Sequence, residues 1–341
     1  MPYISPLLRW PDAVSAAAPD AGIAMHYGDP FGEQRALVEH TGMVDRSNRC
    51  IVTIAGADRL TWLHSLSTQH LTDLPAWRGA EALILSPHGH IEHHLVLADD
   101  GVTTWLDVEP GTADDLLRFL DTMRFLLRVE PRDVSEHWAV LSLAGPSTSD
   151  TLDSAGIAAP AGVFDVRPLP GGGLARSMPA GTGCSVDLLV PRTGLEAMAD
   201  RLRAAGARPA GMWAYEALRV EAKRPRVGRE TDHRTIVQEG GWLEAAVHLD
   251  KGCYRGQETV ARVHNLGRPP RRLVLLHLDG SADTLPAHGA VISLAGRPVG
   301  FVGTAARHYL LGPIALGLVK RNTPDDAPLR VDTLDASIDA A

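Results

Sequence analysis

Eight consecutive residues, Lys251 to Glu258, combine more chemistry than a packing segment needs. They place a cation, a thiol, a phenol, an amide and a carboxylate around two glycines, in the order Lys-Gly-Cys-Tyr-Arg-Gly-Gln-Glu. No hydrophobic period runs through them, so a polar loop is expected. The glycines would let the backbone turn sharply or approach a ligand, and Lys251 would favour the thiolate of Cys253. The alternative is a connector with a half-buried cysteine, because free cysteine often serves as a small hydrophobe.

Glu221 is a second candidate, near the end of a helix predicted over Met212 to Ala222. A step of about 100° per residue places Glu221 near the middle of an apolar arc, and Glu216 and Arg219 outside it. The arc is formed by Trp213, Ala214, Ala217, Leu218 and Val220. A carboxylate on an apolar face has to be paired or hydrogen-bonded, because its bare burial is costly. The partner would be an arginine such as Arg219 or Arg224, or the donors of a ligand.

A cluster of histidines precedes this region, at His88, His90, His93 and His94, with Glu92 among them. In a strand, His90, Glu92 and His94 share one face. The other face carries Ile91, His93, Leu95 and Leu97. A strand of this kind can hold two imidazoles on its solvent face without a metal, so no metal site is predicted.

The elements that must position these groups alternate along most of the chain. Predicted strands are Ile51–Ile54, Ala82–Leu85, Ile91–Leu97, Val102–Val108, Trp138–Leu143 and Val186–Val190. Predicted helices are Asp58–Leu66, Thr112–Leu127 and Gly194–Ala205. Asp58 would cap the first helix, and Leu116, Leu120, Met123 and Leu127 have helical spacing in the second. Gly171–Gly173 is predicted to be a hairpin tip. Pro269–Pro270 and Gly280–His288 mark a boundary, after which short strands dominate.

Composition limits the class of protein. With 341 residues, 45% of them hydrophobic, the chain is expected to form two or three packed globular units. Its formal charge of −8 argues against broad nucleic-acid binding, and no apolar run reaches the roughly 20 residues of a membrane span. Cys50, Cys184 and Cys253 are scattered and odd in number, which favours a reducing, cytoplasmic location. Three separate thiols also lack the four ligands that an iron–sulfur cluster usually takes.

The motif around Cys253, extended by Thr259-Val260-Ala261-Arg262, resembles the signature of the YgfZ family. These are folate-binding relatives of the glycine-cleavage T-protein (aminomethyltransferase) that support iron–sulfur cluster assembly or repair. The resemblance covers roughly residues 35 to 322. Further segments similar to the T-protein are His40–Ser47, Leu63–Leu71, Leu141–Pro146, Leu218–Ala222 and Arg297–Gly303.

This resemblance implies an α+β fold: a three-domain, T-protein-like cloverleaf around a central folate channel, with a C-terminal all-β, barrel-like domain. Residues 1–34 would be an N-terminal extension. Residues 35–268 would form the folate-binding region of two interleaved domains, and residues 269–341 the barrel-like domain.

The resemblance also implies the ligand, tetrahydrofolate or a one-carbon derivative. Glu221 matches the glutamate of the T-protein segment Leu-Arg-Leu-Glu-Ala. One carboxylate there can accept two parallel hydrogen bonds from the donor edge of a pterin. Asp45 ends a segment that lines the folate channel in the family, although it and Ser47 would equally cap a turn. The expected folate contacts are Glu221, Asp45, Asn48, Arg49, His93, Tyr254, Gln257, Glu258 and Arg262, and the expected catalytic residues are Cys253 and Lys251.

One departure from the T-protein pattern bears on activity. Gly89–Leu95 aligns with the T-protein segment Gly-Gly-Ile-x-Asp-Asp-Leu, and both acidic positions are histidine here, His93 and His94. An imidazole cannot replace a carboxylate that holds or deprotonates an ammonium-bearing intermediate, so glycine-cleavage activity is not expected.

The resulting expectation is a folate-dependent accessory factor with Cys253 as its working thiol. Its partners would be reduced folate and iron–sulfur proteins or their assembly factors, with a link to tRNA modification, and no direct nucleic-acid or membrane binding. Two alternatives stay open: a folate-dependent aminomethyl- or methyltransferase, and a folate-binding scaffold without turnover. In the scaffold, Cys253 would be replaceable without loss.

Overall fold

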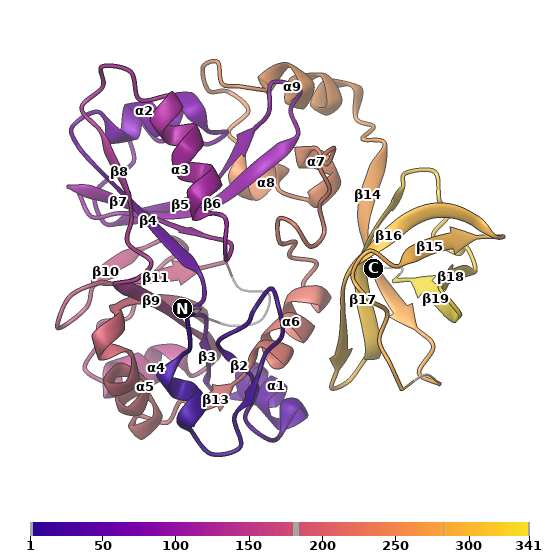
Figure 1. Cartoon of the computed structure of the whole chain (residues 1–341), viewed down its shortest axis with the longest axis horizontal. Helices are drawn as coiled ribbons and strands as arrows, with labels where there is room; N and C mark the ends of the chain where they lie inside the picture. The colour runs from indigo at the N-terminus through magenta and orange to yellow at the C-terminus, as the bar shows by residue number, and fades with distance from the viewer. Residues whose placement is uncertain (1–2, 180–183, 282, 340–341) are drawn as a thin grey trace. The chain divides into compact units, whose positions relative to one another are not determined.

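A computed structural model describes residues 3–179, 184–281 and 283–339 (Figure 1). The chain divides into two compact units. The first comprises the chain up to Ser65, His70–Ala82 and Leu95–Tyr215, and the second comprises Leu66–Gln69, Leu83–His94 and the chain from Glu216 onward. No helix in the described residues is long and apolar enough to cross a membrane.

The first unit contains a six-stranded sheet. Its strands, in spatial order, are β10 (Val166–Pro168), β11 (Leu174–Met178), β12 (Cys184–Pro191), β9 (Trp138–Gly145), β3 (Gly42–Asp45) and β13 (Arg208–Ala210). Only β3 and β13 pair in parallel; the other neighbours are antiparallel. Buried leucine, valine and alanine side chains of β9 and β12 form one core with helix α5 (Leu195–Ala204). The glycines 171–173 join β10 to β11 with positive φ angles, which confirms the predicted hairpin.

Around this sheet lie short elements: a 3-10 helix η1 (Pro6–Arg9), the β1–β2 ribbon (Val14–Ser15 and Ala24–His26), η2 (Arg192–Gly194) and helices α1 (Pro30–Glu39) and α4 (Thr148–Ser154). Helix α1 packs on β3, β9 and β13. It therefore lies against the strand that carries Asp45.

A second sheet has five strands, in the order β5 (Arg78–Leu85), β6 (Ile91–Asp99), β7 (Thr103–Val108), β4 (Cys50–Ala55) and β8 (Glu130–Asp133). Each strand predicted in this stretch is present. Helices α2 (Arg59–Leu66) and α3 (Ala113–Thr122) belong to the same stretch, and α3 packs on β4 and β8.

One predicted helix boundary and one predicted helix cap are wrong. Helix α3 ends at Thr122 rather than at Leu127: Phe125 has φ +46°, and Leu126 is 99% exposed. The leucine spacing continues past the helix, but its last side chains have no core to enter. The carboxylate of Asp58, expected to cap α2, instead binds the backbone N–H and the guanidinium of Arg128.

The second unit ends in a closed, antiparallel six-stranded barrel. Its order is β14 (Arg271–Leu278), β17 (Gly312–Lys320), β16 (Arg297–His308), β15 (Val291–Leu294), β18 (Leu329–Val331) and β19 (Leu334–Ile338). Closure leaves no free strand edge, so every strand finds two partners. The barrel confirms the all-β C-terminal domain, and the mixed elements before it confirm the α+β class.

The second unit also contains the end of α6 (Met212–Glu221), from Glu216 onward, and the helices α7 (Val237–Gly240), α8 (Leu243–Ala246) and α9 (Gln257–Leu266). Helix α6 packs Ala217 and Val220 against barrel residues Leu275, Ala306, Ile314 and Leu316. A separate apolar cluster around Trp242 joins α7, α8 and α9 to the ends of β5 and β6. This second cluster supports the Lys251–Glu258 segment.

Candidate functional site

The Lys251–Glu258 segment comprises the end of the α8–α9 linker and the first two residues of α9, and it is anchored by its aromatic residue. Tyr254 is buried in the apolar cluster with Leu85, Trp242 and Val260. Burial raises the pKa of Tyr254 to about 12, so the phenol stays neutral at physiological pH. The motif is therefore a loop pinned at its centre by a core side chain.

Lys251 fixes the start of the same loop. Its side chain is only 6% exposed, and its ammonium donates to the carbonyls of Ser67, at 2.6 Å, and Gln69, at 3.0 Å. The ammonium also lies 5.0 Å from the centroid of the Tyr254 ring, a cation–π arrangement. Burial lowers the pKa of Lys251 to about 8. These contacts give Lys251 a structural role that the sequence pattern did not predict.

Two glycines allow the end of the loop to approach the turn before β6. Gly256 is the N-cap of α9 and has φ +81°, a conformation that favours glycine. A Cβ there would lie 2.7 Å from the Ser86 carbonyl oxygen and 2.8 Å from the Cα of Gly89. The Thr259 hydroxyl donates to the His88 carbonyl across the same contact, at 2.9 Å. Only a glycine fits this approach, which explains the second glycine of the motif.

Between these fixed points the thiol is presented outward. Cys253 is exposed, whereas Cys50 and Cys184 are partly buried. The sulfur of Cys50 accepts a hydrogen bond from the Gly111 backbone N–H at 3.3 Å. Exposure thus singles out Cys253 as the accessible thiol.

We expect iodoacetamide at neutral pH to alkylate Cys253 before Cys50 and Cys184, because the rate depends on access and on thiolate content. Tryptic mapping after brief treatment measures the order of labelling. Faster labelling of Cys50 or Cys184 would make the motif a structural turn rather than a reactive site.

The remaining motif residues lie on or beside α9. The Gln257 amide donates to the Lys251 carbonyl at 3.5 Å, and Arg255 pairs with Glu92 at 3.2 Å. Glu258 and Arg262 are exposed on α9, and His93 is partly buried on β6. These side chains all belong to the second unit, together with Cys253 and Lys251.

Glu221 does not lie where the helical pattern predicted. It is the last residue of α6, and its side chain is 42% exposed, so the predicted burial on an apolar arc is wrong. Its partner is neither Arg219 nor Arg224: the carboxylate lies 3.2 Å from Nε2 of His308. The other arc residues do face inward, with Ala214, Ala217 and Val220 fully buried. The carboxylate therefore projects beyond the packed face of the helix and is accessible.

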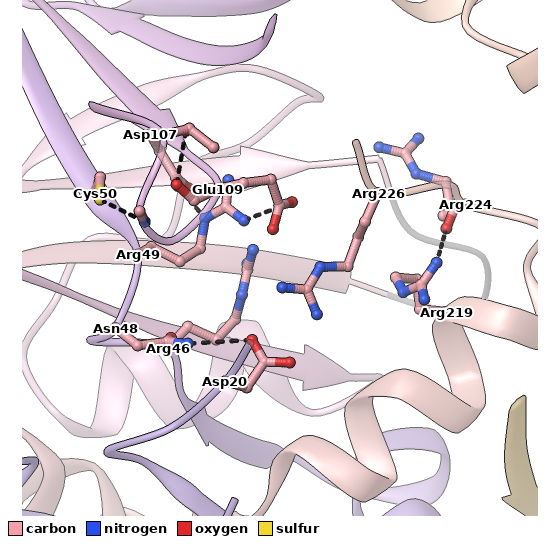
Figure 2. A network of polar contacts seen from close by, with 12 residues as sticks. Asp20, Arg46, Asn48, Arg49, Cys50, Asp107, Glu109, Arg219, Arg224 and Arg226 are labelled. Atoms are coloured by element: carbon pink, nitrogen blue, oxygen red, sulfur yellow. Dashed lines mark hydrogen bonds and ion pairs between the residues drawn. The ribbon is translucent and has the colours of Figure 1, made fainter. Parts of the chain in front are cut away.

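Glu216 and Arg219, the polar residues expected outside the apolar arc of α6, are instead largely shielded from solvent. Arg219 forms two hydrogen bonds with Glu216, at 3.0 and 2.6 Å, and pairs with Glu230 at 3.1 Å. It also donates to the Thr304 hydroxyl at 2.8 Å. A further hydrogen bond runs from Arg219 to the Arg224 carbonyl (Figure 2). Arg226 binds the same Glu216 carboxylate at 3.1 Å. This network fixes the end of α6 and hence the position of Glu221.

Asp45, Asn48 and Arg49 lie in the first unit, and each is engaged within it. The Asp45 carboxylate is buried and accepts from the Ser47 backbone N–H at 2.9 Å, which is the turn-capping role considered as the alternative. Burial raises the pKa of Asp45 above its ordinary value. Asn48 donates to Asp20 at 3.1 Å, and Arg49 binds Asp107 and Glu109, the latter at 2.9 Å (Figure 2).

Arg49 is part of a larger buried ion network that the sequence did not reveal. Arg176, 0% exposed, bridges Asp107 at 3.1 Å and Asp187 at 3.0 Å, and Arg46 approaches Asp187 at 3.5 Å. Burial by itself would raise the pKa of Asp187, but Arg46 and Arg176 outweigh it and hold the pKa below its usual value. No sequence signal marks this set, because its members are spread over more than a hundred residues.

The histidine cluster does not form a metal centre in the described residues: no group of three or more histidine, cysteine or acidic side chains there is arranged to hold an ion. The His94 ring instead packs against Trp242, with centroids 5.6 Å apart.

Comparisons with known proteins agree with this architecture. Residues 30–163 match the family described as the GCVT N-terminal domain. A chloroplastic Arabidopsis thaliana protein named as a transferase is 29% identical over 271 residues, covering 76% of this chain, which spans 60% of that protein's length. An aminomethyltransferase of Symbiobacterium thermophilum is 27% identical over 307 residues, covering 83% of this chain and 79% of the relative.

Among solved structures, the glycine-cleavage aminomethyltransferase T of Bartonella henselae superposes with a TM-score of 0.86. It covers 98% of this chain and 95% of its own, at 17% sequence identity. That likeness shows the fold. The chain thus has a T-protein-like fold, and its sequence is similar to the GCVT N-terminal domain and to aminomethyltransferases.

Proposed function

We propose that this protein is a reduced-folate-binding accessory factor of the YgfZ type, acting in the cytoplasm. It supports the assembly or repair of iron–sulfur proteins, and through them tRNA modification, with Cys253 as its working thiol. The observation that carries the proposal is the exposed thiol on a loop anchored by Tyr254 and Lys251. A loop held at both ends presents a nucleophile in a defined position.

The T-protein-like fold supports the folate part, because the family that the chain resembles binds tetrahydrofolate. Glu221 fits the pterin: its carboxylate is accessible, and the Arg219 network fixes the helix end that carries it. Of the predicted contacts, His93, Tyr254, Gln257, Glu258 and Arg262 belong to the same unit as Glu221 and remain part of this proposal. When bound, tetrahydrofolate would supply one-carbon chemistry, while Glu221 orients the ring.

An aminomethyltransferase is the second candidate, favoured by the names of several relatives. His93 and His94 count against it, because an imidazole does not replace the acidic pair of the T-protein segment. An assay with an aminomethylated lipoyl carrier and tetrahydrofolate separates the two: the accessory factor should release no ammonia above background.

Complementation tests the proposed function. In a strain lacking its own YgfZ, the wild-type gene should restore the activity of iron–sulfur enzymes, and Cys253→Ala should restore little or none. Cys184→Ala is the matched control and should behave as wild type, because that thiol is partly buried and belongs to the first unit. Full rescue by Cys253→Ala at equal protein level would favour a folate-binding scaffold instead.

A further inference from the structure

One face of the barrel strand β16 meets helix α6 residue by residue. Thr304, Ala306 and His308 alternate along the strand, so they share a face, and all three are buried. Thr304 accepts a hydrogen bond from Arg219 at 2.8 Å, and Ala306 packs in the cluster of Ala217 and Val220. His308, the next residue on that face, lies opposite Glu221.

The hydrogen bonds of His308 define its tautomer. Nδ1 faces the backbone N–H groups of Leu310, at 3.3 Å, and Leu311, at 3.1 Å. A nitrogen that accepts hydrogen bonds carries no proton, so in the neutral ring the proton is on Nε2. Burial lowers the pKa of His308, which keeps the ring neutral at physiological pH.

The protonated nitrogen faces the Glu221 carboxylate. His308 is 2% exposed, so water does not satisfy Nε2, and no described residue accepts a hydrogen bond of normal geometry from it. The Glu221 carboxylate lies 3.2 Å from Nε2, close enough for a charge-assisted hydrogen bond. A carboxylate has about four acceptor sites, so a bond from His308 leaves room for two donors from solvent.

We propose that His308 is a positioning residue that holds the Glu221 carboxylate in the orientation that receives the pterin. This inference rests on the proposed folate function. A free glutamate at a helix end samples several rotamers, and ordering it on binding lowers affinity. His308 orders the carboxylate before the ligand binds. At Glu221, the register of β16 against α6 places the buried imidazole of His308 next to an accessible carboxylate.

The test is calorimetric titration with 5-formyltetrahydrofolate. His308→Leu should weaken binding by about three- to tenfold, the range expected for ordering one flexible side chain. His308→Gln should bind nearly as wild type, because its amide restores a donor near the Nε2 position. When Glu221 is already glutamine, His308→Leu should weaken folate binding little further. A general effect on barrel packing would instead weaken folate binding equally in both backgrounds.

The outcomes separate the two claims. If the wild type and His308→Leu bind folate equally well, the positioning role is wrong while the folate site stands. The same conclusion follows if His308→Leu lowers folate affinity as much in the Glu221→Gln background as in the wild type. If the wild type binds no folate at millimolar concentration, the proposed function fails, and the positioning role fails with it. Nitrogen-15 histidine spectra give a readout without ligand: Nε2 should be protonated, and a proton on Nδ1 would contradict the assigned geometry.

Discussion

Replacing Arg176 with methionine should destabilise the first unit by about 3–5 kcal/mol, the usual cost of removing one partner from a buried ion pair. Arg176 is fully buried and bridges Asp107 and Asp187. The substitution preserves much of the apolar volume but removes a cation from between two buried carboxylates. We expect the melting temperature to fall by on the order of 10 °C, as measured by calorimetry.

Arg118→Met is the control. Arg118 is 76% exposed and pairs with Asp115 on the surface of α3, so its loss should change stability by less than about 1 kcal/mol. Equal effects of the two substitutions would show that the buried network does not hold the unit together.

Acid should weaken the same network. Asp187 has a lowered pKa in the folded protein, so its contribution is present above the unfolded value of about 3.9. That contribution is lost as the pH falls through the lower folded pKa.

Glu221→Gln should weaken the binding of reduced folate by about 1.5–3 kcal/mol, roughly 10- to 150-fold, if a charge-assisted hydrogen bond to the pterin is lost. The amide keeps the size of the side chain but presents one acceptor oxygen and a donor group where the pterin presents donors. Isothermal titration with 5-formyltetrahydrofolate measures the change. Because Glu221 is partly exposed, stability without ligand should hardly move.

Glu244→Gln is the matched control for this experiment. Glu244 is an exposed carboxylate on α8 in the same unit, and no role in the site is assigned to it. Its substitution should leave folate affinity unchanged. A Glu221→Gln protein that binds as tightly as the control would remove Glu221 from the site.

Much of the fold could be predicted from local patterns. Strands such as Cys50–Ala55 and Cys184–Pro191 form where apolar and β-branched residues cluster, and their predicted cores, Ile51–Ile54 and Val186–Val190, lie within them. The loop around Cys253 was also predictable from its lack of periodicity, although helix α9 begins inside the motif at Gln257. Local sequence determines these features, since neighbours within a few residues decide them.

The errors arose where distant residues decide the outcome. A helical projection treats Glu221 like a residue in the middle of α6. The helix ends at Glu221, however, so the carboxylate extends beyond the packed surface into solvent. The same projection put Arg219 outside the arc, whereas Glu230 and Thr304, supplied by other segments, make its burial possible. Lys251 likewise finds its carbonyl partners at Ser67 and Gln69, which no spacing in the motif could reveal.

The central claim is that the protein binds reduced folate, and a thermal melt of the wild type with increasing tetrahydrofolate or 5-formyltetrahydrofolate tests it most directly. A ligand that binds only the folded state stabilises it by RT ln(1 + [L]/Kd), about 2.7 kcal/mol at a hundredfold excess over Kd. If the protein binds reduced folate, the melting temperature should rise with the logarithm of folate concentration and rise less for Glu221→Gln. A melting temperature that stays flat up to millimolar folate would contradict this claim.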